Sequence, residues 1–336
     1  MNADTLKDRT ILVTGGGGFL GGAIVRQLSE RGAKLRTFSR QRYAELEKLG
    51  VEQFQGALDN GNAVDEVVEG CDLVFHVAAK AGIWGPYDDY HRTNVVGTEN
   101  VINACRKHGV ERLIYTSSPS VVFNGTDMEG VDESVPYPEH FEAYYPQTKA
   151  MAEQKVMAAN DDSLATVSLR PHLIWGPGDN HLVPRIIAKG KAGQIRKIGK
   201  RENKVDSIYI DNAADAHLLA AEKLAPGSAV AGKAYFISQD EPLSVWELIN
   251  RILEAGDVPP VKRSISPGLA YFAGCVCETV YRAFGLKGEP RMTRFVAREL
   301  STAHWFDISA AKRDFGYVPR VSIDEGLKRL AEHLGP

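Results

Sequence analysis

The sequence predicts an α/β fold, a doubly wound parallel sheet with a smaller C-terminal lobe. Over residues 1–175, short apolar runs alternate with amphipathic helix patterns, which implies parallel strands covered by helices on both faces. A glycine-rich turn joins the first apolar run directly to a helix pattern. The pattern loosens after that, so we expect residues 176–203 and 241–336 to form the lobe, with segments of about 204–240 returning to the first domain.

The glycine-rich turn follows the strand expected at residues 10–14. Three of its glycines have the spacing G-x-x-G-x-x-G, which suits a tight turn, a close approach to a pyrophosphate and tight packing of a helix on a strand. Free N–H groups at the helix N-terminus favour negative charge. The order strand, glycines, helix favours a Rossmann-type dinucleotide site over a flexible glycine turn. The residues expected to form it are Gly15, Gly18, Phe19, Leu20 and Gly21.

The end of the second expected strand, residues 34–40, indicates which dinucleotide binds. An NAD site places Asp or Glu there to hold the ribose 2′-hydroxyl, whereas a 2′-phosphate needs a cation and tolerates no carboxylate. This chain has Ser39 and Arg40, with Arg42 close behind, and Arg can form paired hydrogen bonds with phosphate. The sequence therefore predicts NADP(H), with Ser39 and Arg40 in contact with it. The alternative is that both arginines are ordinary surface residues.

The next strands are expected at residues 51–56 and 73–79. The second ends in Ala78 and Ala79, where a flat cofactor needs small neighbours, so both are predicted cofactor contacts. The loop at 80–87 mixes aromatic and turn residues at the ligand-binding edge of the sheet.

A later strand, residues 112–118, ends in hydroxyl side chains, and the helix after it carries a tyrosine and a lysine. Tyr145 and Lys149 are four residues apart and so share one helix face. Such pairs are common on exposed helices. The position of this one, after the glycine turn and one strand–loop unit beyond the serines, favours a catalytic role. In the helix expected at 91–107, Asn94 is either a solvated residue or a buried polar anchor.

Composition excludes several classes of function. With 43% hydrophobic and 25% charged residues among 336, the chain is typical of a soluble α/β protein. A net charge of -3 gives no reason to expect nucleic acid or an anionic membrane as a partner. The polar N-terminus lacks the apolar region of a signal peptide, so we expect a cytoplasmic protein with four reduced cysteines. No residue cluster has metal-ligand spacing, and we expect no metal.

Taken together, these motifs resemble the extended short-chain dehydrogenase/reductase superfamily, over nearly the whole chain. The matching segments are residues 14–21, 115–118, the Tyr145/Lys149 pair, 169–179 and 205–212. Residues 158–161, 232–238 and 315–319 resemble the 3β-hydroxysteroid dehydrogenase branch, which includes the sterol-4-carboxylate 3-dehydrogenases. Within that branch, residues 79–85 and 288–305 are most similar to the bacterial 2-alkyl-3-oxoalkanoate reductases of long-chain olefin biosynthesis.

At two positions this chain departs from the superfamily pattern, so the roles known for those positions cannot be assigned to it directly. Many relatives have an acid after the third strand that holds the adenine, where this chain has Ala57. The contact is then expected from the neighbouring Leu58 and Asp59 or from backbone. The dehydratase branch has an Asp-Glu pair just after the catalytic hydroxyl, and Pro119-Ser120 in its place argues against dehydration.

The resemblance implies a role for each site residue. Tyr145 donates a proton to a ketone oxygen, and Lys149 lowers the phenol pKa from about 10 toward 7 and holds the nicotinamide ribose. Ser118, or otherwise Ser117, bonds the substrate carbonyl. Pro171 shapes the loop over the nicotinamide.

For the narrower branch, the resemblance implies NADPH-dependent reduction of the 3-keto group of a long-chain 2-alkyl-3-oxoalkanoate, a β-keto acid, in the C-terminal lobe. Trp84 is an expected substrate contact, and the candidates for meeting the carboxylate are Lys80, His172, Arg291 and Arg294. The apolar segment 268–284 is expected to be either a lid or wall for the acyl chain or a buried core helix. Glu278 and Arg282 interrupt it, so no transmembrane span is expected, although loose membrane or partner contact is possible.

Three other functions stay open. A 3β-hydroxysteroid or sterol dehydrogenase would run oxidatively and favour NAD. A nucleotide-sugar epimerase would retain NAD and need cations for a diphosphate, and an inactive NADP(H)-binding scaffold would usually lack Tyr145 or Lys149. The resemblance also implies a homodimer packed through the helices that begin near His91 and Tyr144. Association with other enzymes of the pathway is plausible because β-keto acids are unstable.

Overall fold

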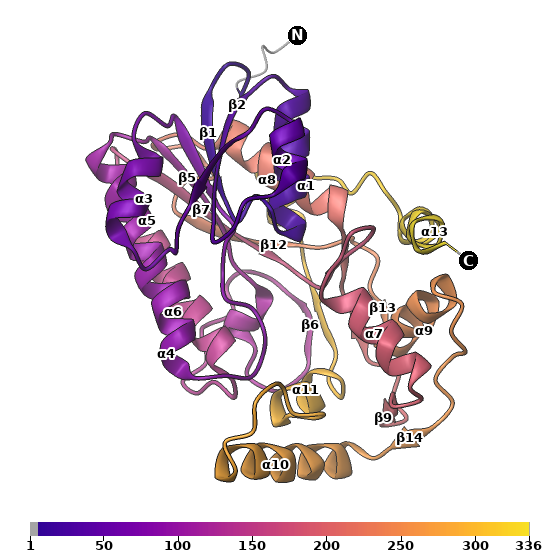
Figure 1. Ribbon diagram of the computed structural model, residues 1–336. Helices are drawn as coiled ribbons and strands as arrows, with labels where there is room; N and C mark the ends of the chain where they lie inside the picture. Colours follow the sequence, from indigo (N-terminus) through magenta and orange to yellow (C-terminus); the bar gives the residue numbers. More distant parts are fainter. Residues whose placement is uncertain (1–5, 336) are drawn as a thin grey trace.

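The computed structural model describes residues 6–335 and has a seven-stranded parallel sheet at its centre (Figure 1). The strand order is β12-β7-β5-β4-β1-β2-β3. It reverses direction between β1 and β4, which is the switch point where doubly wound sheets bind ligands. The predicted Rossmann-type fold is therefore confirmed. The strands are β1 (Thr10–Thr14), β2 (Lys34–Ser39), β3 (Glu52–Gln55), β4 (Leu73–His76), β5 (Arg112–Thr116), β7 (Ala165–Pro171) and β12 (Lys233–Ile237).

Helices cover both faces of this sheet because successive side chains of each strand point to opposite sides. Ile11 and Val13 of β1 pack in one hydrophobic cluster with α1 and α8, whereas Leu12 packs in another with α3, α5 and α6. This explains why the strands read as continuous apolar runs. The helices are α1 (Phe19–Glu30) and α8 (Ile210–Lys223) on one face, and α3 (Gly61–Val68), α5 (Gly97–Lys107) and α6 (Tyr144–Ala158) on the other (Figure 1). A short helix, α2 (Ala44–Lys48), follows β2.

The long helix expected at residues 91–107 is irregular at its start. It begins as α4 (Tyr87–Tyr90), passes through a π-helical segment, η1 (His91–Val96), and continues as α5. Wide turns of this kind are rare and are frequent at functional sites. Asn94 lies within η1 and is buried, so it is a polar anchor rather than a solvated residue.

The C-terminal half builds a second, smaller sheet in the order β13-β10-β15-β6. One of its strands, β6 (Met128–Val131), comes from the first half of the chain; the others are β10 (Lys204–Val205), β13 (Leu243–Ser244) and β15 (His304–Phe306). The helices near it are α7 (Leu182–Lys191), α9 (Val245–Ala255), α10 (Pro267–Ala283) and α11 (Arg294–Glu299). Two further helices, α12 (Ser309–Phe315) and α13 (Ile323–Leu334), end the chain.

The sequence pattern predicts one returning strand over residues 204–211, and this prediction is wrong. The segment consists of β10 and β11 (Ile208–Tyr209), which belong to different sheets; β11 pairs with β8 (Ile174–Trp175). Between them, the buried carboxylate of Asp206 accepts a hydrogen bond from the backbone N–H of Phe306 at 2.7 Å. This polar contact ties the intervening turn to β15.

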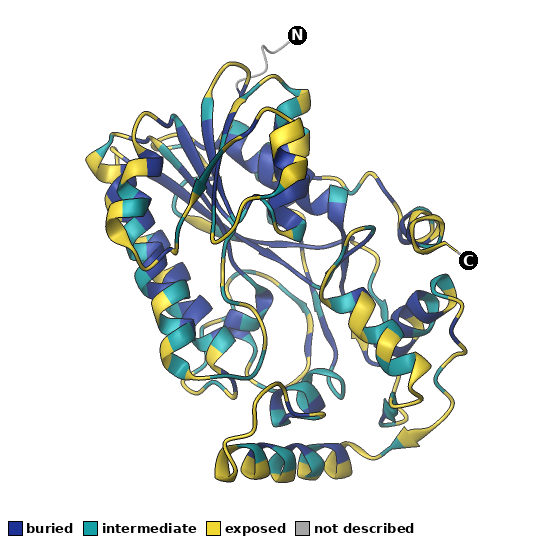
Figure 2. Ribbon diagram, viewed as in Figure 1, coloured by how far each residue is buried: buried dark blue, intermediate teal, exposed yellow. Residues whose placement is uncertain are grey.

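The buried core helix considered for residues 268–284 is also wrong. Only Ala270, Gly274 and Glu278 of α10 are buried, and exposed residues run along the length of the helix (Figure 2). Across residues 6–335, no helix combines the length and apolar character that crossing a bilayer requires. All four cysteines are free thiols, and Cys71 and Cys105 are buried.

Candidate active site

The glycine turn brings the start of α1 closer to β1 than any side chain would allow. Gly15 has a φ of +71°, and a Cβ added there would lie 3.1 Å from the Cα of Ala78. A Cβ on Gly21 would overlap the carbonyl oxygen of Gly15, which is backbone and cannot move aside. Gly18 is the N-cap of α1 and has no side chain to bond the first N–H groups. The N-terminal turn of α1 therefore keeps donors available for an anion.

Two cations lie at the end of β2 without partners. Arg40 and Arg42 are exposed, and neither guanidinium forms a hydrogen bond or ion pair with any described residue. By contrast, Arg36 of the same strand pairs with Glu52 at 2.9 Å. The hydroxyl of Ser39 is buried without a hydrogen-bond partner among the described residues. The end of β2 thus offers one hydroxyl and two unneutralised positive charges.

The loop after β4 is held by two buried polar side chains. Thr14 Oγ1 accepts hydrogen bonds from the N–H groups of Val77 and Ala78, both at 3.1 Å, which ties the end of β4 to the end of β1. Asn94 accepts from the N–H of Lys80 at 2.7 Å and donates to its carbonyl oxygen at 3.1 Å. The same amide donates to Thr148 Oγ1 at 3.0 Å, so η1 joins the loop to α6. These bonds position Ala78, Ala79 and Lys80 at the switch point.

Ser118 lies just beyond β5, and Tyr145 and Lys149 lie on the first two turns of α6; their catalytic roles stay predictions. Ser118 caps a short 3₁₀ helix, η2 (Pro119–Val122), just beyond β5, and its Oγ lies 2.9 Å from that of Ser120. Ser118 is near enough to Tyr145 to lower the pKa of that phenol. Lys149 lies one turn further along α6, where its Nζ donates to the Thr116 carbonyl oxygen at 2.6 Å. Ser118, and not the fallback Ser117, therefore meets the tyrosine; the Ser117 hydroxyl is buried without a partner in the described chain.

The prediction that Lys149 makes Tyr145 acidic is wrong for this arrangement. Burial raises the pKa of Tyr145 to about 12, and the nearby Ser118 hydroxyl only partly offsets this. Lys149 directs its ammonium at the end of β5, 4.1 Å above the ring of Tyr115, and does not contribute to the shift. Burial instead lowers the pKa of Lys149 itself to about 7, against the opposing effect of Glu153.

A residue that the sequence reasoning missed faces the same tyrosine. Glu299, at the end of α11, is close enough for its charge to raise the pKa of Tyr145. Its carboxylate has no hydrogen bond or ion pair with any described residue, and burial raises its pKa to about 7. Nothing local distinguishes it, because a glutamate in the charged sequence of α11 resembles an ordinary solvated residue.

The predicted substrate residues have different surroundings. Trp84 packs edge-on against Tyr281 with ring centroids 6.1 Å apart, so the loop after β4 contacts α10. Lys80 Nζ lies 3.4 Å from the Asp89 carboxylate. Arg291 is exposed and has no ion-pair partner among the described residues.

Two candidates for meeting a carboxylate are poorly suited to that role. His172 is buried with its ring centroid 5.0 Å from that of His304, and burial holds its pKa well below the ordinary value. It is therefore neutral and supplies no cation. Arg294 is engaged by the buried Glu278, to which its Nε donates at 2.9 Å.

The remaining predicted cofactor residues line the same edge of the sheet. Pro171 ends β7 and is buried beside Ile237 of β12. Leu58 is buried, and its carbonyl oxygen accepts from Asn100 at 2.8 Å. The Asp59 carboxylate lies 4.0 Å from Arg92. Their contacts with a cofactor stay predictions.

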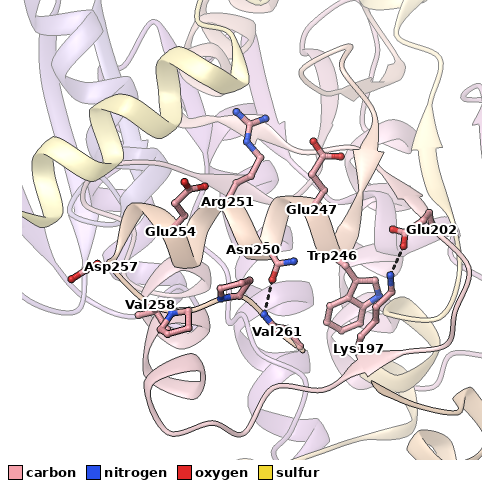
Figure 3. Close-up of a pocket in the computed structure, with 12 residues that line it drawn as sticks. Lys197, Glu202, Trp246, Glu247, Asn250, Arg251, Glu254, Asp257, Val258 and Val261 are labelled. Atoms are coloured by element: carbon pink, nitrogen blue, oxygen red, sulfur yellow. Dashed lines mark hydrogen bonds and ion pairs between the residues drawn. The ribbon is translucent and has the colours of Figure 1, made fainter. Parts of the chain in front are cut away.

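A separate groove lies in the lobe, away from these residues. It has a volume of about 720 Å³ and runs between α9 and the segment after it, with Lys197 of β9 (Lys197–Ile198) at one end (Figure 3). Asn250 closes part of it by accepting a hydrogen bond from the N–H of Val261 at 2.9 Å. Its walls hold neither Ser118 nor Tyr145, so it is not the active site.

Comparison with known proteins places the chain in a family. The model of the 3-beta hydroxysteroid dehydrogenase/isomerase family matches residues 12–266. The chain belongs to this family. A 2-alkyl-3-oxoalkanoate reductase of Stenotrophomonas maltophilia is 56% identical, over 95% of this chain and 98% of that protein. One of the same name from Shewanella oneidensis is 51% identical, over 99% of this chain and 88% of its own. The predicted resemblance is thus confirmed.

Solved structures share the fold over almost the full length. The crystal structure of gox2253 superposes with a TM-score of 0.77 at 28% identity, covering 97% of this chain and 99% of that one. A UDP-glucose 4-epimerase of Thermus thermophilus, in complex with NAD, has a TM-score of 0.73 at 22% identity, covering 97% and 98%. As a member of this dehydrogenase family with reductases as relatives, the protein is an oxidoreductase acting on CH–OH groups.

Proposed function

We propose that the protein is a ketoreductase that uses NADPH to reduce the 3-keto group of long-chain 2-alkyl-3-oxoalkanoates to the 3-hydroxy acid. The observation that carries this proposal is the phenol of Tyr145, which lies near Ser118 at the end of β5 and is kept protonated by burial. A protonated phenol is a general acid, which is what reduction of a ketone requires. The relatives named 2-alkyl-3-oxoalkanoate reductase support the substrate class.

The residues at the switch point fit a phosphorylated dinucleotide. The turn at Gly15 and Gly21 has no room for a Cβ, and the uncapped start of α1 suits a pyrophosphate. The buried, unpaired hydroxyl of Ser39 and the uncommitted guanidinium of Arg40 suit a ribose 2′-phosphate. The unpaired cation favours NADPH over NADH, and with it reduction over the oxidative sterol-type reaction. When bound, NADPH supplies the hydride to the ketone carbon.

The chain's own residues complete the reaction. The carbonyl π electrons move to oxygen, which takes the hydroxyl proton of Tyr145, and the resulting phenolate recovers a proton from solvent. Ser118 donates to the developing alkoxide and stabilises the charge that forms there. Lys149 is proposed to hold the nicotinamide ribose from the next turn of α6. Because burial raises the pKa of Glu299 to about 7, its carboxyl is about half protonated at pH 7 and increasingly protonated below it, which reduces the negative charge beside the developing alkoxide.

The lobe is proposed to accept the acyl chain, with Trp84 contacting it and Lys80 or Arg291 meeting the carboxylate. We also propose a homodimer through η1–α5 and α6, and a cytoplasmic enzyme that associates with others of its pathway.

The test is a comparative assay of NADPH oxidation by the full-length protein. A β-keto acid with a 2-alkyl branch is compared with a 3-ketosteroid and with a nucleotide sugar. We expect turnover with the β-keto acid, and we expect Tyr145→Phe to reduce it by at least about 100-fold while NADPH still binds. Tyr144→Phe, which alters the neighbouring exposed tyrosine, is the matched control and should change turnover little. Turnover of the steroid alone, or full activity in Tyr145→Phe, would contradict the proposal.

A further inference from the structure

A buried carboxylate lies one helical turn beyond Lys149. Glu153 follows Lys149 by four residues on α6, so the two side chains lie on one face of the helix. Lys149 is 2% exposed, and Glu153 is fully buried. The ammonium of Lys149 donates to the Thr116 carbonyl oxygen at 2.6 Å and lies over the ring of Tyr115, and neither of these groups is charged. A buried ammonium needs a counter-charge nearby to keep its proton.

Donors from two other segments hold Glu153 in its charged form. Arg170 of β7, itself 3% exposed, donates to Glu153 from Nε at 3.0 Å and from Nη2 at 2.6 Å, one bond to each carboxylate oxygen. The hydroxyl of Tyr137, in the segment before α6, donates to Oε1 at 2.7 Å. Hydrogen bonds of this kind to both oxygens favour the ionised carboxylate. Glu153 therefore carries its negative charge inside the protein.

The other titratable groups around Lys149 supply no counter-charge. His76 of β4 is buried, and desolvation together with the charge of Lys149 lowers its pKa to about 3, so its ring is neutral. Burial raises the pKa of Tyr145 to about 12 and holds that of Tyr115 well above its ordinary value, so both phenols are neutral at pH 7. Among the described residues, Glu153 is the one whose charge raises the pKa of Lys149 against the effect of burial.

We propose that Glu153 is a positioning residue that acts through Lys149: it keeps that side chain in its ammonium form up to neutral pH, at the end of β5. The use of this ammonium to hold the nicotinamide ribose rests on the proposed function. Arg170 is required because an unpaired buried carboxylate would bind a proton and lose its charge. A pair that only ties α6 to β7 would affect stability and leave the protonation of Lys149 unchanged.

The test is a ¹³C NMR titration of the lysine Cε resonances in the full-length protein, with Lys149→Met to assign the resonance of Lys149. Glu153→Leu with Arg170→Met removes both charges, so the pH at which Lys149 is half deprotonated should fall by at least about one pH unit. Glu153→Gln with Arg170→Met should give the same fall, and its amide keeps an acceptor for Tyr137 if the first variant does not fold. Tyr137→Phe removes a hydrogen bond to Glu153 and no charge, and this matched control should leave the titration of Lys149 in place.

Reduction rates give a second readout of the same change. Wild type and the double variants are compared in a Glu299→Gln background, because Glu299 also titrates near pH 7. We expect kcat/KM for the β-keto acid to fall as Lys149 loses its proton, and this fall should lie at least about one pH unit lower in the double variants.

An unchanged titration of Lys149 in both double variants would overturn the proposal, because the pair of Glu153 and Arg170 would then only stabilise the fold. The NMR titration requires no turnover. A shifted titration of Lys149 in a protein that reduces no β-keto acid would support the link between Glu153 and Lys149 and contradict the proposed function.

Discussion

Raising the pH from about 8 to about 10 should separate the two directions of the reaction at Tyr145. Reduction uses the protonated phenol as an acid, whereas oxidation of the alcohol uses the phenolate as a base. With a pKa of about 12, the phenolate fraction is about one in 10⁴ at the lower pH and about one in 100 at the higher. The phenol fraction hardly changes. We therefore expect kcat/KM for oxidation to rise by about 100-fold and kcat/KM for reduction to stay within about twofold.

This pH window isolates the tyrosine. Lys149 and Glu299 both have pKa values of about 7, so both have largely finished titrating at its lower end. The assay follows dinucleotide absorbance in each direction with saturating cofactor and varied keto or hydroxy acid. Tyr145→Phe serves as the control, because its residual rates should be low and independent of pH across the window. An oxidation profile that levels off below about pH 8 would refute the reasoning, since the phenol would then be acidic, as the sequence pattern alone suggests.

Three further changes test the cofactor site, the scaffold and the carboxyl group of Glu299. In fluorescence titrations, Arg40→Ala should weaken the binding of NADPH by about 10- to 100-fold and that of NADH by less than about twofold, because only NADPH loses a charged hydrogen bond to its phosphate. Equal weakening of both affinities would contradict the assignment of Arg40 to the 2′-phosphate. Glu153→Gln leaves the charge of the buried Arg170 unpaired and should lower the free energy of unfolding, measured in urea, by about 3–5 kcal/mol. The double variant Glu153→Leu with Arg170→Met removes both charges and should recover most of that loss. Glu299→Gln should be more stable than wild type by up to about 3 kcal/mol at about pH 8. Because the pKa of Glu299 is raised in the folded protein, folded wild type binds more protons than the unfolded chain between about pH 4.5 and 7. Its free energy of unfolding should therefore fall as pH rises through this range. Parallel curves of unfolding free energy against pH for wild type and Glu299→Gln would count against this.

Local sequence patterns are sufficient to predict those parts of the site whose geometry depends on residues close together in the chain. The spacing of Gly15, Gly18 and Gly21 between a strand and a helix predicts the turn, because each glycine is required by contacts within that one unit. The spacing of Tyr145 and Lys149 places both side chains on one helix face. The placement of Ser118 beside Tyr145 follows from parallel topology, which brings strand ends to a common edge.

The errors concern properties that depend on distant segments. The predicted acidity of Tyr145 considered only Lys149, but burial and the charge of Glu299, more than 150 residues later, act in the opposite direction. The sequence cannot decide whether Asn94 is solvated, because the answer depends on the loop at Lys80 and on Thr148 of α6.

By itself, the sequence determined the doubly wound fold and the glycine turn, and it predicts the Ser118–Tyr145–Lys149 group. Periodicity and spacing are local, and the chain cannot bury its apolar strands in many other ways. Only the tertiary structure decided the protonation of that group and the orientation of α10. Desolvation depends on every segment packed around a side chain, and the close contact of α11 with Gly274 determines which face of α10 meets solvent.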